Sequence, residues 1–221
     1  MNPLIVALDV PSLDEASLLA RKIGDAAGAF KVGLELFSAE GPRAVSAIEG
    51  PVFLDLKLHD IPTTVARALR VLDVVAPWMV NVHSLGGRAM LEAAVEAKPS
   101  STKLLAVTIL THLGDDDLAE LGLPKASEAV PSLAKIASES GCDGVVCAPD
   151  DVALIRAVVP KEFLIVTPGS RPAGDAHDEH ARGATPREAI EAGADYVVVG
   201  RPITRAPDPR AAAGAIAKEL G

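Results

Sequence analysis

The 221-residue chain has little of several residue types, and each shortage excludes a class of protein. Aromatic residues make up 3%, too few for the stacking platforms of a single-strand nucleic-acid binder. The 21 basic residues are outnumbered by 30 acidic ones, and the net charge of −9 argues against nucleic acid or a membrane as partner. The chain has no apolar run long enough to span a bilayer, and its start lacks the features of a signal peptide.

Cysteine is also scarce. Cys142 and Cys147 are too few for a disulfide framework, and their spacing is not that of a metal site. We expect two buried free thiols in a reducing compartment, and therefore a cytoplasmic protein.

Short, almost continuously apolar runs alternate with alanine-rich stretches of helical spacing along the whole chain. The runs cover residues 4–10, 29–34, 52–58, 78–83, 104–110, 143–149, 163–169 and 196–200. Such runs are typical of parallel strands covered on both faces. Eight strand–helix units in this length predict a single-domain α/β fold, the (β/α)8 or TIM barrel, over residues 1–221. An open doubly wound sheet is the alternative, but a glycine-rich fingerprint does not follow the first run.

One segment without apolar periodicity, residues 170–186, follows the seventh predicted strand. Loops of this length in compact domains are usually functional, and we interpret this one as a lid over the site.

Polar residues stand at the carboxyl ends of the predicted strands. They are Asp9, Lys31, Asp55 with Lys57, His83, Thr111, Pro168 with Gly169, and Gly200 with Arg201. Active sites of (β/α)8 barrels are built at this end of the strands. We therefore expect the site there.

The third run, FLDLKLHDIP at residues 53–62, is the most informative. Strand alternation puts Asp55 and Lys57 on the face opposite Leu54 and Leu56, so the two charged residues point into the barrel. Lys57 stands between two carboxylates, Asp55 and Asp60. Nearby negative charge keeps a lysine protonated, which suits a proton donor and disfavours a Schiff-base nucleophile. A salt-bridge network that only closes the barrel end is the alternative interpretation.

The eighth run predicts an anion site. Phosphate often binds after strands seven and eight of such barrels, where Gly200 permits a close backbone approach and Arg201 offers a fork of donors. A surface arginine is the alternative for Arg201. A metal site at Asp55, His59 and Asp60 is disfavoured, because the ammonium of Lys57 at its centre would repel a cation.

The stretch FLDLKLHDIPTTV resembles the D-x-K-x-x-D-I-P-x-T signature of the orotidine 5′-monophosphate (OMP) decarboxylase family. IVALDV, FKVGLELFSAEGP, WMVNVHSLGG, LLAVTILT, VTPGSRP and DYVVVGRPIT match other strands of that family in order. The resemblance covers nearly the whole chain. It implies a lyase of pyrimidine biosynthesis that converts OMP to uridine 5′-monophosphate (UMP) without cofactor or metal.

The resemblance also implies a role for each matching residue. Asp55 would lie against the substrate carboxylate, Lys57 would protonate C6, and Lys31 and Asp9 would bind the ribose and complete the charge network. The remaining matches are Asp60, Ile61 and Thr64, which would reach into the partner's site of a homodimer; Thr111 at the pyrimidine; and Pro168, Arg171, His180, Gly200 and Arg201 around the phosphate end.

Two positions depart from the family pattern. Thr63 stands where the family usually has asparagine. His180 aligns with a glutamine that bridges phosphate and base in the family, and a histidine there would make phosphate binding weaker or pH dependent. Three other functions remain open: a metal-dependent sugar-phosphate enzyme on the same barrel, a Schiff-base aldolase, and a non-catalytic nucleotide-binding protein.

Overall fold

A computed structural model describes residues 2–168 and 184–221, and the part of the chain it describes forms a closed barrel of parallel strands. Each strand pairs with the next along the chain, and β8 pairs with β1. The strands are β1 (Leu4–Ala7), β2 (Ala29–Val32), β3 (Val52–Leu58), β4 (Met79–His83), β5 (Lys103–Val107), β6 (Gly144–Val146), β7 (Leu164–Pro168) and β8 (Tyr196–Val199). The predicted (β/α)8 barrel is confirmed, and each predicted strand is present with its ends shifted by at most three residues.

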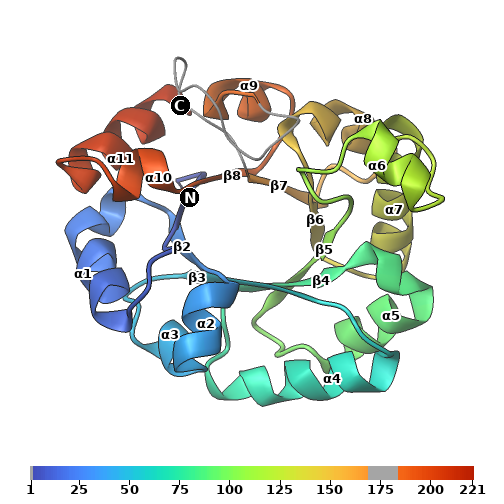
Figure 1. Ribbon diagram of the computed structural model, residues 1–221, viewed down its shortest axis with the longest axis horizontal. Coiled ribbons are helices and arrows are strands. Elements are labelled where there is room, and N and C mark those ends of the chain that lie inside the picture. The colour runs from blue at the N-terminus through green and yellow to red at the C-terminus, as the bar shows by residue number, and fades with distance from the viewer. Residues whose placement is uncertain (1, 169–183) are drawn as a thin grey trace.

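Helices surround the barrel as an outer ring (Figure 1). They are α1 (Leu13–Ile23), α2 (Leu34–Glu40), α3 (Arg43–Ser46), α4 (Pro62–Val71), α5 (Gly87–Ala97), α6 (Asp115–Glu120), α7 (Ala126–Glu139), α8 (Val152–Arg156), α9 (Pro186–Glu191), α10 (Arg201–Thr204) and α11 (Pro209–Glu219). Short 3-10 turns are η1 (Gly24–Ala26), η2 (Leu72–Val74), η3 (Ser84–Gly86) and η4 (Pro149–Asp151). No helix among the described residues has both the length and the apolar character needed to cross a membrane.

Local sequence signals begin and end several of these helices. The Ser12 hydroxyl accepts a hydrogen bond from the Glu15 N–H at the start of α1, and Gly24 ends that helix at φ +54°. Thr185 and Glu188 form a capping box at the start of α9.

The predicted lid was placed at 170–186, but Pro186 is the first residue of α9, so the loop ends one residue earlier. Residues 169–183 lie outside the described part of the chain.

Two apolar layers follow from strand alternation. One face of each strand packs against the helices, and Leu54, Leu56 and Leu58 belong to this outer layer. The other face fills the barrel with Ile5, Ala7, Ala29, Phe53, Met79, Leu105, Val107, Val146, Val166 and Val198. Cys142 and Cys147 are buried thiols, and burial raises the pKa of Cys142 to about 12.

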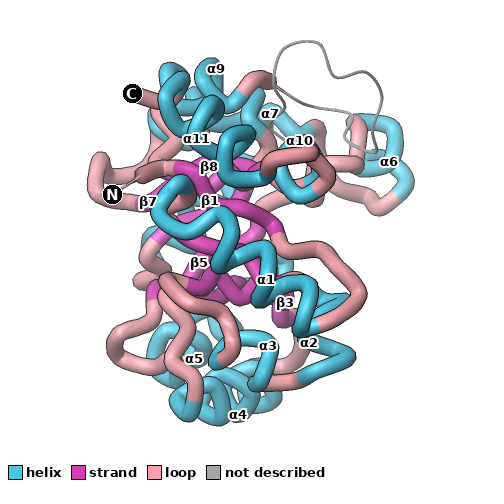
Figure 2. Tube along the Cα trace, turned by 90° about the vertical axis from the view of Figure 1, so that its left-hand side faces the viewer, coloured by secondary structure: helices cyan, strands magenta, loops and turns pink. Residues whose placement is uncertain are grey.

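The interior changes character toward the carboxyl ends of the strands. In four neighbouring strands or strand ends, an interior apolar residue is followed two positions later by a polar one: Ala7 by Asp9, Ala29 by Lys31, Phe53 by Asp55, and Met79 by Asn81. In the side view, the chain begins at the left, and α2 and α10, which follow β2 and β8, lie farther right, toward this end (Figure 2). The polar residues therefore form one layer at the carboxyl ends of the strands, next to the apolar interior of the barrel.

Candidate active site

Four charged residues form a continuous array in this polar layer. Lys31 Nζ lies 3.0 Å from Asp9 Oδ1 and 3.3 Å from Asp55 Oδ2, and Lys57 Nζ lies 2.6 Å from Asp55 Oδ1. The signs alternate from Asp9 through Lys31 and Asp55 to Lys57. The structure thus joins the four residues that the sequence suggested as one cluster.

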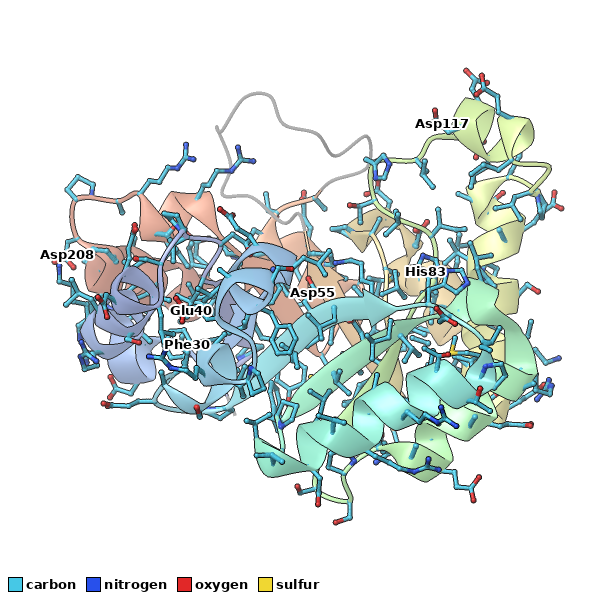
Figure 3. All side chains as sticks on the ribbon, turned by 60° about the horizontal axis from the view of Figure 1, so that its bottom comes forward. Phe30, Glu40, Asp55, His83, Asp117 and Asp208 are labelled. Atoms are coloured by element: carbon cyan, nitrogen blue, oxygen red, sulfur yellow. The ribbon has the colours of Figure 1, made fainter. Side chains whose placement is uncertain are left out.

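The centre of the array is buried and its two ends reach toward solvent. The side chains of Lys31 and Asp55 are 10% and 12% exposed, against 32% for Lys57 and 56% for Asp9. Asp55 points toward the middle of the barrel in Figure 3. Charged side chains that are this buried occur almost only where they are paired with other charged or hydrogen-bonding groups.

The array stabilises the charged forms of its buried members. Burial raises the pKa of the Asp55 carboxyl, but the charges of Lys31 and Lys57 outweigh this and leave the pKa below its usual value. Burial likewise lowers the pKa of Lys31, and the carboxylates of Asp55 and Asp9 reverse the change, so that its pKa is raised. Both side chains are therefore ionised near neutral pH.

The structure corrects one prediction about Lys57. The sequence placed this lysine between two carboxylates, Asp55 and Asp60. Among the described residues Lys57 is paired with Asp55 alone, whereas Lys31 lies between Asp9 and Asp55. Asp60 is exposed in the turn before α4, where its carboxylate accepts a hydrogen bond from the Ile61 N–H.

Asn81 belongs to the site and was not predicted from the sequence. It is completely buried in β4; its Nδ2 donates to Asp55 Oδ1 over 2.7 Å, and its Oδ1 accepts from the Lys57 N–H over 2.7 Å. Its signal was available, because Asn81 shares the interior face of an apolar strand with Met79 and His83.

A histidine pair lies beside the array. The rings of His59 and His83 stack with centroids 5.2 Å apart, and His83 Nδ1 accepts a hydrogen bond from the Leu85 N–H. His83 is the last residue of β4, the strand that pairs with β3, which carries Asp55 and Lys57. Burial, then the charges of His59 and Lys57, lower the pKa of His83 to about 4. The His83 ring is therefore neutral at physiological pH.

The other predicted residues stand at the same end of the barrel. Thr111 follows β5 and is half-buried, and Pro168 is the last residue of β7. Gly200 precedes α10 directly after β8, and Arg201 is the exposed first residue of that helix. Ile61 and Thr64 are exposed at the start of α4. The predicted contacts of Arg171 and His180 lie outside the described residues.

Within the described part of the chain, no group of three or more His, Cys, Asp or Glu side chains is arranged to hold a metal ion. That the reaction needs no metal ion nevertheless stays a prediction.

Residues 2–216 match the profile of the orotidine 5′-phosphate decarboxylase / HUMPS family. The chain belongs to this family. A protein from Thermobifida fusca (strain YX), named orotidine 5′-phosphate decarboxylase, is 48% identical over 99% of this chain and 95% of its own length. A relative of the same name from Anaeromyxobacter sp. (strain K) is 49% identical over 98% of this chain and 97% of its own.

Solved structures of the family have the same barrel. Orotidine 5′-phosphate decarboxylase from Lactobacillus acidophilus superposes with a TM-score of 0.86 at 40% identity, covering 99% of both chains. The enzyme from Pyrococcus horikoshii OT3 gives a TM-score of 0.80 at 27% identity, covering 98% of both chains. Family membership thus extends over the whole barrel and includes the strands that carry the array.

Proposed function

We propose that this chain decarboxylates orotidine 5′-monophosphate to uridine 5′-monophosphate and carbon dioxide, a step of pyrimidine biosynthesis. The observation that carries the proposal is the array of Asp9, Lys31, Asp55 and Lys57, buried at its centre, at the carboxyl end of a barrel of this family. The buried thiols suit a reducing cytoplasm.

Lys57 is the proton donor in this reaction. The bond between C6 and the substrate carboxylate breaks, carbon dioxide leaves, and the electron pair remains on C6. A nearby ammonium stabilises that developing charge, and its proton then moves to C6. The position of Lys57 supports this role, since its Nζ is at the partly exposed end of the array, where a ligand can reach it.

The other array members bind and orient the substrate. Asp55 faces the substrate carboxylate, while Asp9 and Lys31 take the ribose hydroxyls. Each carboxylate oxygen of Asp55 already contacts a lysine, Oδ2 with Lys31 and Oδ1 with Lys57. The carboxylate therefore cannot rotate away from a ligand without breaking a contact.

The phosphate lies over the ends of β7 and β8. Of the residues that the structure describes, Gly200 and Arg201 bind the phosphate in this proposal. Pro168 lies beside them, and Thr111 contacts the pyrimidine. Arg171 and His180 complete this group on the strength of the family resemblance, as does the predicted lid. The exposure of Arg201 at the end of β8 supports this position for the phosphate.

The active unit is a homodimer in which Asp60, Ile61 and Thr64 of each chain reach the partner's site. All three are exposed, Asp60 and Ile61 just before α4 and Thr64 in its first turn, and Ile61 is 65% exposed. Leu34 and Leu85, which follow β2 and β4, are 56% and 42% exposed. Apolar residues after three consecutive strands support a surface covered by a second chain.

The test is an absorbance assay of OMP with and without EDTA. We expect equal loss of OMP in both conditions. A requirement for a divalent cation would instead favour a metal-dependent sugar-phosphate enzyme of the same family, and no loss in either condition would overturn the proposal.

The proton donor is tested by Lys57→Ala, with Lys103→Ala as a matched control. Lys103 is half-buried at the opposite end of the barrel, at the start of β5. Lys57→Ala should abolish turnover while calorimetry still detects UMP binding, and Lys103→Ala should keep both. Turnover retained by Lys57→Ala contradicts the assignment.

A further inference from the structure

The backbone of β3 is irregular where it carries the charged residues. Leu54 pairs with Val80 and Leu58 with Val82, so three residues of β3 lie opposite the single residue Asn81 of β4. Lys57 has φ +50°, in the left-handed region that residues other than glycine rarely adopt. Bulges of this kind redirect side chains next to active sites.

The side chain of Asn81 replaces the backbone pairing that the bulge removes. Its Oδ1 accepts from the Lys57 N–H, and its Nδ2 donates to Asp55 Oδ1, each over 2.7 Å. The assignment of the two amide atoms is fixed, because a backbone N–H must face the oxygen and a carboxylate must face the NH2 group. Asp55 Oδ1 also receives Lys57 Nζ at 2.6 Å. Asn81, Asp55 and Lys57 therefore form a closed ring of three contacts.

We propose that Asn81 is a positioning residue for the decarboxylation. It holds the left-handed backbone at Lys57 and, through the same amide group, the carboxylate that fixes the lysine's ammonium. The reason is geometric: a lysine side chain is long and flexible, so its Nζ keeps one place only if both its backbone and its partner are fixed. The inference rests on the proposed reaction, because it assigns a cause to the position of the proton donor.

Removal of the amide group should release both restraints. The left-handed conformation at Lys57 would lose its hydrogen bond and relax toward ordinary strand geometry, which moves the start of the side chain. Asp55 would keep its two lysines but could rotate. Misplacement of a reacting group by about 1 Å lowers turnover about 100-fold. Groups that bind the ribose and the phosphate would not move, so KM should change much less than kcat.

The alternative is that Asn81 is an ordinary buried hydrogen-bonding residue whose loss only lowers stability. Thr102→Val provides the matched control. Thr102 is 1% exposed, and its hydroxyl donates to the Pro77 carbonyl at the opposite end of the barrel. Both substitutions remove buried hydrogen bonds, but only that at Asn81 affects the array.

The experiment compares wild type, Asn81→Ala, Asn81→Asp and Thr102→Val, with kcat expressed per UMP-binding site from calorimetry. Unfolded molecules then lower the number of sites and leave kcat unchanged. Asn81→Asp keeps an oxygen for the Lys57 N–H but replaces the donor to Asp55 with a second carboxylate. We expect a fall in kcat of about 100-fold for Asn81→Ala and a marked fall for Asn81→Asp, with KM within about threefold of wild type. Thr102→Val should melt earlier and keep its kcat.

The outcomes separate this inference from the proposed function. An inactive wild type overturns the function, and this inference with it. An active wild type with unchanged kcat in Asn81→Ala overturns the inference alone. If Asn81→Ala yields no folded protein, the nearly isosteric Asn81→Asp and the smaller polar Asn81→Ser decide: wild-type kcat per site in either refutes the positioning role.

Discussion

Asp55→Asn is the substitution that tests the array most directly. The carboxylate lies 2.6 Å from Lys57 Nζ and 3.3 Å from Lys31 Nζ, while its own side chain is 12% exposed. The attraction of unit charges at these distances is about 6 and about 5 kcal/mol at an effective dielectric constant of 20. The cost of removing the ions from water offsets much of this, and the partial exposure of Lys57 screens its share.

The net loss of stability is set by what remains after the substitution. An amide at position 55 leaves Lys31 buried without its central partner and turns an NH2 group toward one of the two ammoniums. Breaking a buried ion pair by removing one member costs about 3–5 kcal/mol. We expect a loss of this size in the free energy of unfolding, measured by urea denaturation at neutral pH and followed by circular dichroism.

The control is Asp25→Asn. Asp25 Oδ1 lies 2.6 Å from Arg210 Nη2, the same distance as in the Asp55–Lys57 pair, but its side chain is 87% exposed. Surface pairs contribute at most about 1 kcal/mol, so this variant should unfold close to wild type. If Asp55→Asn were as stable as Asp25→Asn, the array would not be a coupled network and the reasoning would be refuted.

Three further predictions follow from the site. The pKa of His83 is about 4 in the folded chain against 6.5 as the ordinary value, so the unfolded state binds more protons between these limits. The contribution of His83 to the free energy of unfolding is therefore fully present above about pH 6.5, and it falls by about 2 kcal/mol toward pH 4, after a discount for partial solvation. In urea titrations at several pH values, His83→Asn should reduce this dependence of the unfolding free energy on pH. An unchanged dependence would exclude His83 as its source. Ile61→Asp should convert a dimer into monomers in sedimentation experiments and reduce turnover with them, and a dimer that persists would remove Ile61 from the interface. Arg201→Ala should raise KM for OMP about 10- to 100-fold, as expected for a charged hydrogen bond to phosphate, and an unchanged KM in initial-rate assays would make Arg201 a surface residue.

Strand alternation accounts for what the sequence could predict. Continuous apolar runs identified the strands, and the period of two separated the leucines that face the helices from Asp55 and Lys57, which face the barrel. Because parallel strands all end at one side, residues far apart in the chain, such as Asp9 and Lys31, were expected to meet there. The contact between them confirms this expectation.

The bulge in β3 accounts for what the sequence could not predict. Alternation assumes one residue opposite one residue, but three residues of β3 lie opposite Asn81. Single-sequence patterns contain no signal for a left-handed lysine, since that conformation depends on a hydrogen bond from another strand. The pairing of Lys57 with one carboxylate instead of two has the same kind of cause: Asp60 follows the turn and bonds locally to Ile61.

The order of charges in the array explains how a site that is costly to bury can suit this reaction. Asp9, Lys31, Asp55 and Lys57 carry no formal net charge together, and the two that are buried, Lys31 and Asp55, carry opposite charges. In the proposed reaction a bound substrate would add a carboxylate beside Asp55, whose contacts with Lys31, Lys57 and Asn81 hold it in place. That repulsion would disappear when carbon dioxide leaves as a neutral molecule, whereas the attraction between Lys57 and the new charge on C6 would appear at the same step. Interactions that improve only as the reaction proceeds raise kcat instead of tightening substrate binding. The stability lost in burying Lys31 and Asp55 would thus be linked to the one step of the proposed reaction that the arrangement of charges favours.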